Sequence, residues 1–145
     1  MANGFEVDCV WRAQGRGFQM AVRQHQGQII HRTGQVAWDV DENLVGKGDV
    51  AAQTRQCLRN IERLLGAVGG ELADVVSITT YYTDRAPLPL IQNVRNEFFA
   101  AATAPVSTSV MVAGLGDPEF LVELTPIAVV PNDRCTPTQH RGERS

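Results

Sequence analysis

The sequence predicts a single α+β domain with two helices packed on one face of a β-sheet. Three observations support this prediction. Two segments carry apolar residues at three- and four-residue steps, which is typical of amphipathic helices. Other segments are rich in β-branched residues or alternate apolar with polar residues, which is typical of strands. A chain of 145 residues that is 43% hydrophobic is also long enough to bury one core.

The part before the first helix is predicted to hold a β-hairpin. After a loose start, residues 19–23 and 28–33 have the composition of two strands, and His25-Gln26-Gly27 supplies the turn between them. Residues 34–35 close the second strand, and a polar loop follows.

The first helix is predicted to begin after Asp49, whose side chain can cap the free N–H groups of the first turn. From Val50 to Val68 apolar residues recur along one side, with charged residues on the other. Gly69-Gly70 is a suitable C-terminal stop.

A strand and a second helix follow. Residues 75–83 are dense in β-branched and aromatic side chains, which favours a strand. Asp84 and Pro87 indicate the start of a helix whose apolar stripe runs from Leu88 to Ala102 and which Pro105 ends.

Two more strands complete the predicted order β-β-α-β-α-β-β. Residues 107–113 alternate, and residues 120–130 form the last strand, in which Pro126 implies a bulge or an edge position. Residues 1–131 are therefore predicted to form the domain, and the polar residues 132–145 a mobile tail.

One face of such a sheet needs a cover, because two helices cover only the other. We expect the uncovered face to carry four residues: Ser107, Ser109, Met111 and Glu123. A symmetric oligomer would supply the cover.

Glu123 interrupts the apolar run of residues 120–124. An ionised carboxylate without a partner loses several kcal/mol of hydration when a strand buries it. The group must therefore reach a partner, stay protonated, or open into a polar cavity, where it could work as an acid or base. The alternative is a glutamate on an edge strand that simply faces water.

Composition disfavours several classes of partner. The net charge of −3 and the pI near 5.5 leave no general basic field for nucleic acid or anionic membranes. No apolar run approaches the length of a membrane span, and the first residues lack a signal-peptide pattern. Three widely spaced cysteines indicate reduced thiols, and hence a cytoplasmic protein.

The residues available also disfavour common cofactor sites. The only lysine, Lys47, lies in a glycine-containing turn, which argues against Schiff-base chemistry. His25 and His31 have no cysteine or carboxylate companion at ligand spacing, so no metal site is expected.

The chain also carries a series of short motifs. They are Thr33-Gly34-Gln35, residues 48–56 (GDVAAQTRQ), Asn60-Ile61, residues 72–76 (LADVV), Tyr82-Thr83-Asp84, residues 96–99 (NEFF) and residues 120–123 (FLVE). In this order and at nearly this spacing they resemble the RidA/YjgF family of reactive-intermediate deaminases. The resemblance covers about residues 19 to 130.

The resemblance implies a chorismate-mutase-like fold and a homotrimer with a small-molecule ligand in a cleft at each subunit interface. It also implies hydrolysis of imines and enamines, such as 2-aminoacrylate, to a keto acid and ammonia without metal or cofactor. Other members of the family are described as ribonucleases or ligand binders, or have no established activity.

Site residues follow from the resemblance one at a time. Glu123 matches the family glutamate that positions or activates the attacking water. Thr33 and Gly34 match the loop whose backbone meets the ligand. Gln92 lies where many members have an asparagine near the cleft, and Ser109 where several have a cysteine.

Two positions depart from the family pattern. Ser107 replaces the arginine that clamps the substrate carboxylate, and a serine hydroxyl cannot reproduce that charge. Met20 replaces a tyrosine near the N-terminus, with Phe18 as the nearest ring able to substitute. We therefore expect a ligand that is neutral or that carries its polar groups elsewhere.

The resulting expectation is a cofactor-free hydrolase for a small imine, enamine or related carbonyl compound. Two alternatives remain open. One is a trimeric small-molecule binder that has lost catalysis, and the other, weaker one is an endoribonuclease-like activity. Ser107 and Ser109 could offer two hydroxyls to a ligand, and the alternative, slightly favoured, is that they are small polar residues at a packed seam between subunits.

Overall fold

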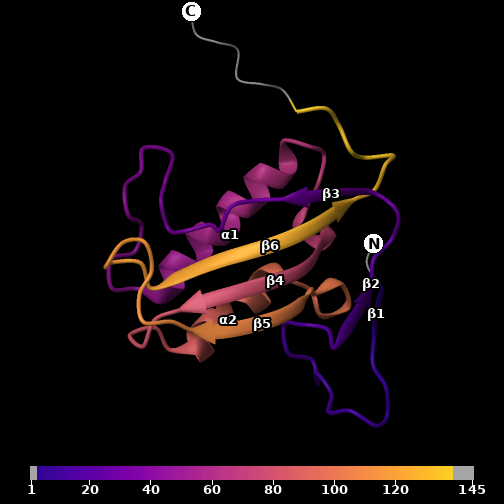
Figure 1. Ribbon diagram of the computed structural model, residues 1–145, viewed down its shortest axis with the longest axis horizontal. Coiled ribbons are helices and arrows are strands. Elements are labelled where there is room, and N and C mark those ends of the chain that lie inside the picture. The colour runs from indigo at the N-terminus through magenta and orange to yellow at the C-terminus, as the bar shows by residue number, and fades with distance from the viewer. Residues whose placement is uncertain (1–2, 139–145) are drawn as a thin grey trace, which may run out of the picture.

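The computed structural model describes residues 3–138, and its elements follow the predicted order with one short strand added at the start (Figure 1). The strands are β1 (Asn3–Phe5), β2 (Ala21–Arg23), β3 (Gln28–His31), β4 (Val75–Tyr82), β5 (Val106–Met111) and β6 (Val122–Val130). The helices are α1 (Val50–Gly66) and α2 (Leu88–Phe98), with short 3-10 turns at Leu72–Asp74 and Ala101–Thr103.

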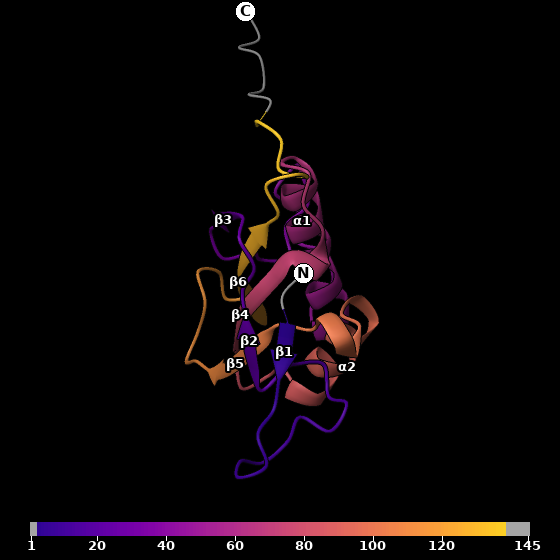
Figure 2. The same cartoon turned by 90° about the vertical axis from the view of Figure 1, so that its right-hand side faces the viewer.

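The main sheet has four strands in the order β3-β6-β4-β5. It is mixed, because β4 and β5 run parallel while the other neighbours are antiparallel. Both helices pack on the same face (Figure 2), so the predicted α+β arrangement is confirmed.

The predicted hairpin between the second and third strands is wrong. β2 pairs with the unforeseen β1, whereas β3 pairs with β6. The reason lies in the two faces of the sheet. Ile30 of β3 packs into the core beneath the helices, but Val22 of β2 packs against Val76 and Val129 in a small cluster on the opposite face.

The first helix follows its sequence signals. The Asp49 carboxylate accepts a hydrogen bond from the Ala52 N–H at 3.1 Å, as an N-cap should. Leu58, Ile61 and Leu65 are fully buried along its apolar side. The second helix is shorter than predicted, because Phe99 takes an extended backbone and turns into the core.

A buried glutamine on α1 fixes the entry to β6. The Gln53 side-chain amide donates to the carbonyls of Gly46 and Glu119 at 3.1 and 3.0 Å, and its oxygen accepts from the Leu121 N–H at 2.9 Å. All three bonds are shielded, since Gln53 has no exposed surface. They hold the chain in place two residues before Glu123.

The bulge anticipated at Pro126 lies in the partner strand. His31 is opposite Ile127 and Gln35 is opposite Leu124. Three residues, Arg32 to Gly34, therefore face only two residues of β6. Leu124 exchanges both backbone hydrogen bonds with Gln35, so the N–H missing at Pro126 falls on the same side, where the ladder is already interrupted.

The first part of the predicted tail is held against the domain. Arg134 donates to both carboxylate oxygens of Asp74, at 2.5 and 3.0 Å, and Asp74 has no exposed surface. The Thr136 N–H donates to the Val68 carbonyl at 3.0 Å. Residues 139–145 of the predicted tail lie outside the described residues.

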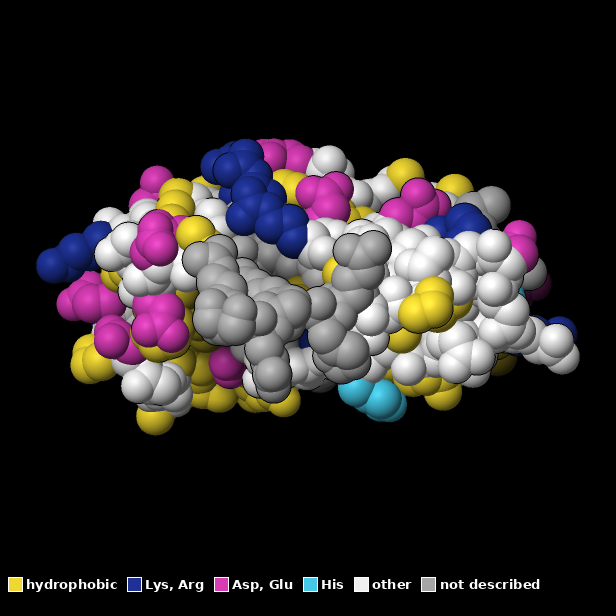
Figure 3. Space-filling model, turned by 90° about the horizontal axis from the view of Figure 1, so that it is seen from above, with side chains coloured by type: hydrophobic (Ala, Val, Ile, Leu, Met, Phe, Trp, Pro, Cys, Tyr) yellow, Lys and Arg dark blue, Asp and Glu magenta, His cyan; other side chains and the backbone are white. Residues whose placement is uncertain are grey.

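On the face seen from above, acidic side chains surround a small group of basic side chains near the upper edge of the view (Figure 3). Neither of the helices described within residues 3–138 combines the length and apolar character that crossing a membrane requires.

Candidate functional site

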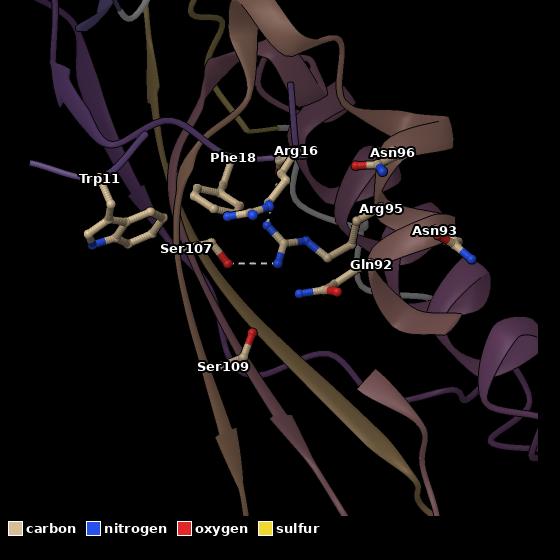
Figure 4. A pocket seen from close by; sticks show the side chains of 10 residues that line it. Trp11, Arg16, Phe18, Gln92, Asn93, Arg95, Asn96, Ser107 and Ser109 are labelled. Carbon is tan, nitrogen blue, oxygen red and sulfur yellow. Dashed lines mark hydrogen bonds between the residues drawn. The ribbon is translucent and has the colours of Figure 1, made fainter. Parts of the chain in front are cut away.

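A cavity of about 330 Å³ opens at the edge of the sheet formed by β5. It lies between β5, α2 and the loop that joins β1 to β2, and we call it the β5-edge cavity (Figure 4). Its walls include the side chains of Phe18, Gln92, Arg95, Ser107 and Ser109. Three of them, Gln92, Ser107 and Ser109, were predicted as ligand contacts. Phe18, the ring suggested as a substitute for the missing tyrosine, also lines the cavity.

Arg95 lines this cavity and contacts two of its other lining residues, Ser107 and Gly17, although it was not among the predicted site residues. Its Nη1 donates to the Ser107 hydroxyl at 2.7 Å, and its Nη2 donates to the Gly17 carbonyl at 3.4 Å. The Nε is buried without a partner among the described residues. Arg95 is 3% exposed, and within residues 3–138 no carboxylate forms an ion pair with it.

Burial lowers the pKa of Arg95 to about 10, which leaves the guanidinium charged at neutral pH. A sequence signal could have found it. Arg95 follows Ile91 by four positions and precedes Phe98 by three, so it interrupts the apolar stripe of α2. The same kind of interruption drew attention to Glu123.

The expectation that Ser107, Ser109 and Met111 lie on the uncovered face is wrong. Ser107 pairs with Ile78 and Ser109 with Thr80, and cross-strand neighbours share a face. Ile78 belongs to the core under the helices. The alternation correctly indicates which residues of β5 share a face. Ser107 and Ser109 can nevertheless lie on the face that carries the helices, because β5 is an edge strand and a cavity lies beside it.

Glu123 lies on the opposite face of the sheet, as predicted. It pairs across β6 with Tyr81 of β4 and is half-buried. β6 is not an edge strand, because it lies between β3 and β4, so the alternative of a glutamate on an edge strand is excluded for the strand as a whole. Within residues 3–138 its carboxylate forms no hydrogen bond or ion pair with another side chain.

The backbone of Gly34 lies directly against this carboxylate. A Cβ placed on Gly34 would come within 2.8 Å of the Glu123 Cδ and 2.9 Å of its Oε1. A side chain at position 34 would therefore displace the carboxylate from this position. The bulge opposite Pro126 therefore brings together two predicted site residues, Gly34 and Glu123.

Thr33 and Gly34 also line a second, larger cavity of about 820 Å³ between this bulge and α1. Arg32 contributes to the same wall, and its guanidinium nitrogens are buried without hydrogen-bond partners among the described residues. Burial lowers the pKa of Arg32 to about 10.

Cys57 lies in the core and has no exposed surface. Burial raises the pKa of its thiol, and the negative charge of Glu123 raises it further. A thiol held protonated in this way is a poor nucleophile. Within residues 3–138 no group of three or more His, Cys, Asp or Glu side chains is placed to hold a metal ion.

The predicted site residues thus fall into two groups at opposite edges of the sheet. Gln92, Ser107 and Ser109 lie at the β5 edge, and Thr33, Gly34 and Glu123 lie where β3 ends beside β6. Two strand spacings, about 10 Å, and the thickness of the sheet separate Ser109 from Glu123. One small molecule cannot touch both groups within a single protomer.

The chain matches the protein-family profile described as "Endoribonuclease L-PSP" over residues 13–130. It is 35% identical over 102 residues to a 3-aminoacrylate deaminase RutC of Acinetobacter baylyi and 33% identical to a RutC family protein of Pyrococcus horikoshii. Each alignment covers 70% of this chain and 79% of the relative.

Solved structures show the same fold. A Rid-family protein of unknown function from Yersinia pestis, YyfB, superposes with a TM-score of 0.79 at 31% identity, covering 89% of this chain and 98% of that one. TdcF of E. coli, solved with bound serine, gives a TM-score of 0.65 at 27% identity, covering 74% and 84%.

Proposed function

Because this chain belongs to the RidA/YjgF family of Rid proteins, we propose that it is a cofactor-free hydrolase of a small imine or enamine, working at sites between the subunits of a homotrimer. The observation that carries this proposal is the half-buried Glu123 carboxylate, unpaired among the described residues and held against the Gly34 backbone. The deaminase named among its relatives supports the reaction class.

Hydrolysis of an imine needs a water molecule activated next to the electrophilic carbon. In the proposed reaction the Glu123 carboxylate accepts a proton from water as the water oxygen bonds to that carbon. The electron pair of the C=N bond moves to nitrogen, which takes up the proton held by Glu123. The carbinolamine hydroxyl then gives its proton to nitrogen through Glu123 as the C–N bond breaks, so ammonia leaves and a carbonyl remains. A positioned general base typically contributes about 10²- to 10⁴-fold.

The two groups of site residues support a ring assembly. A heterologous contact that brings the β5 edge of one copy to the Glu123 edge of the next would complete a site at each seam. Such contacts repeat around a closed ring, which fits the homotrimer that the family resemblance implies. Val110 and Ile29 lie exposed on the face that carries Glu123 and would gain cover.

The first test is ammonia release from a panel of imines, with and without a carboxylate. The Glu123→Gln variant keeps the shape but removes the base, and the exposed Glu62→Gln serves as its matched control. We expect turnover by the parent and by Glu62→Gln, and a loss of about 10²-fold or more in Glu123→Gln. Equal rates in all three would refute the role of Glu123.

The second test is complementation between inactive variants. Ser109→Trp is chosen to fill the β5-edge cavity, because Ser109 is exposed and lines it. When Ser109→Trp and Glu123→Gln trimers exchange subunits at random, about one seam in four joins two intact edges. Recovery of roughly a quarter of the parent activity supports sites shared between subunits, and no recovery from demonstrably mixed trimers argues against them.

A binding protein without catalysis is the second candidate, favoured by the unpaired Arg95 rather than by Glu123. It would bind small ligands yet release no ammonia from any member of the panel. The three free cysteines fit a reducing compartment such as the cytoplasm for either function.

A further inference from the structure

Within residues 3–138, the lining of the β5-edge cavity includes two arginines, Arg16 and Arg95, and no acidic side chain. Arg95 is almost wholly buried, yet its two hydrogen-bond acceptors, the Ser107 hydroxyl and the Gly17 carbonyl, are both neutral. Its Nε remains without a partner among the described residues. A buried charge in this state is unfavourable unless an anionic ligand completes it.

The shape of the cavity favours an organic anion over packing alone. The guanidinium lies between Gln92 of α2 and Ser107 of β5, with Ser109 nearby (Figure 4). All four residues line the cavity of about 330 Å³. A planar fork of N–H donors matches a carboxylate in two parallel hydrogen bonds. Phe18 adds an apolar wall for a short carbon skeleton.

We propose that Arg95 is the anion-binding residue of this site, so that the ligand is a small carboxylate. The guanidinium comes from α2 and reaches across the cavity to Ser107, the position at which the resemblance led us to expect an arginine. Of the two kinds of ligand expected from the missing arginine, a neutral one and one that carries its polar groups elsewhere, this site favours the second. As a statement about substrate the inference rests on the proposed hydrolase function, but as a statement about binding it stands by itself.

The small side chain at position 107 is part of the arrangement. The Ser107 hydroxyl is 2.7 Å from the Arg95 Nη1, so an arginine at position 107 would bring a second guanidinium into the same space. Like charges at this distance repel, and steric overlap adds to the cost. The two positions therefore favour one arginine between them.

The direct experiment is a calorimetric or NMR titration of the purified protein with propionate, its neutral analogue propionamide, and inorganic phosphate. Three proteins are compared: the parent, Arg95→Met, and Arg59→Met, which removes an exposed arginine far from the cavity lining. We expect propionate to bind the parent and Arg59→Met alike and to bind Arg95→Met about tenfold to a hundredfold more weakly. Propionamide should bind the parent no better than it binds Arg95→Met.

Two results would overturn the inference. One is propionate affinity that is unchanged in a folded Arg95→Met protein. The other is tighter binding of phosphate than of propionate, which would assign the site to a different anion.

An exchange of the two side chains provides a variant that does not depend on how well Arg95→Met folds. Arg95→Ser alone should lose propionate binding, whereas Arg95→Ser combined with Ser107→Arg returns a guanidinium to the cavity from the opposite wall. Recovery to within about tenfold of the parent supports a binding role. A purely structural role for Arg95 predicts no recovery of binding in a double variant that is as stable as the parent.

The Glu123→Gln variant separates this inference from the proposed function. It should bind propionate at least as tightly as the parent does, because in the proposed ring the Glu123 of a neighbouring copy lies at this site and the variant removes a negative charge there. If propionate binds through Arg95 but no imine is hydrolysed, the anion site stands and the hydrolase proposal fails. If imines are hydrolysed equally well by Arg95→Met, the hydrolase stands and the carboxylate assignment fails.

Discussion

Arg95 and Arg134 are two arginines whose guanidinium groups differ in their partners: one contacts only neutral acceptors and the other forms an ion pair. Arg134 places a forked pair of hydrogen bonds on the buried Asp74 carboxylate while part of its side chain stays in water. Arg95 is buried more deeply and meets only a hydroxyl and a backbone carbonyl. The first pair is balanced in charge, and the second arrangement is not.

The difference indicates what each arginine does. A balanced pair that joins the 3-10 turn before β4 to the C-terminal segment has a structural role, since both partners are satisfied. An unbalanced guanidinium beside an open cavity stabilises the fold poorly and is available to a ligand. The two sites should therefore respond in opposite ways when their charges are removed.

The largest effect is expected at Asp74. Asp74→Ala removes a buried carboxylate that also accepts the Glu71 N–H at 2.9 Å, leaving that donor and Arg134 without their acceptor. We expect the free energy of unfolding to fall by about 3 kcal/mol, measured by urea denaturation. Asp133→Asn, an exposed change nearby, is the control, and a fall of less than about 1 kcal/mol at Asp74 would show that the pair matters little.

A smaller effect is expected at Arg95, although it is more buried than Arg134. Arg95→Met keeps most of the volume and removes an unbalanced charge, so the free energy of unfolding should change by no more than about 1 kcal/mol in either direction. The same urea measurement checks this. A fall in the free energy of unfolding as large as that of Asp74→Ala would mean that Arg95 supports the fold, as Arg134 does.

Alkaline pH should sharpen the contrast further. Burial lowers the pKa of Arg95 from its ordinary value to about 10, so above pH 10 the unfolded chain binds the proton more tightly than the folded one. The parent should therefore gain stability relative to Arg95→Met as pH rises above 10, while propionate affinity falls. Unfolding and titration between pH 9 and pH 11 test both trends, and parallel behaviour of the two proteins would contradict them.

The smallest effect is expected at the exposed pair that joins the two helices. Arg55 donates to both oxygens of Glu97, at 3.0 and 2.8 Å, and this hydrogen bonding lowers the pKa of the Glu97 carboxyl below its usual 4.5. The stabilisation is therefore present above pH 4.5 and lost as pH falls through the lowered value. Glu97→Gln should lower the melting temperature slightly at pH 7 and not at pH 2, as scanning calorimetry at the two pH values would show.

Much of the fold could be predicted because its signals are local. The Asp49 cap, the apolar periodicity of α1 and the β-branched run of β4 each depend on residues a few positions apart. Pro126 also indicated correctly where a strand ladder would be interrupted. In each case the local preference and the tertiary packing agree.

The errors concern relations between distant segments. Three residues of β1 are too few to carry a periodic signal, so the partner of β2 was missed. The alternation of β5 could not show which face meets the helices, since that depends on its parallel register with β4. Arg95 was overlooked because a single charge within an apolar stripe is usually a long side chain that reaches solvent.

Pro126 also constrains how β6 can align with its neighbours. In the native alignment its missing hydrogen-bond donor points at the gap opposite Arg32 to Gly34, where nothing is lost. A slip of one residue would turn the Pro126 nitrogen towards β4 and remove a backbone hydrogen bond from the middle of the sheet. The same slip would turn the Glu123 side chain into the hydrophobic core. Pro126 thus disfavours the misaligned sheet, in which the Glu123 carboxylate would be buried away from water.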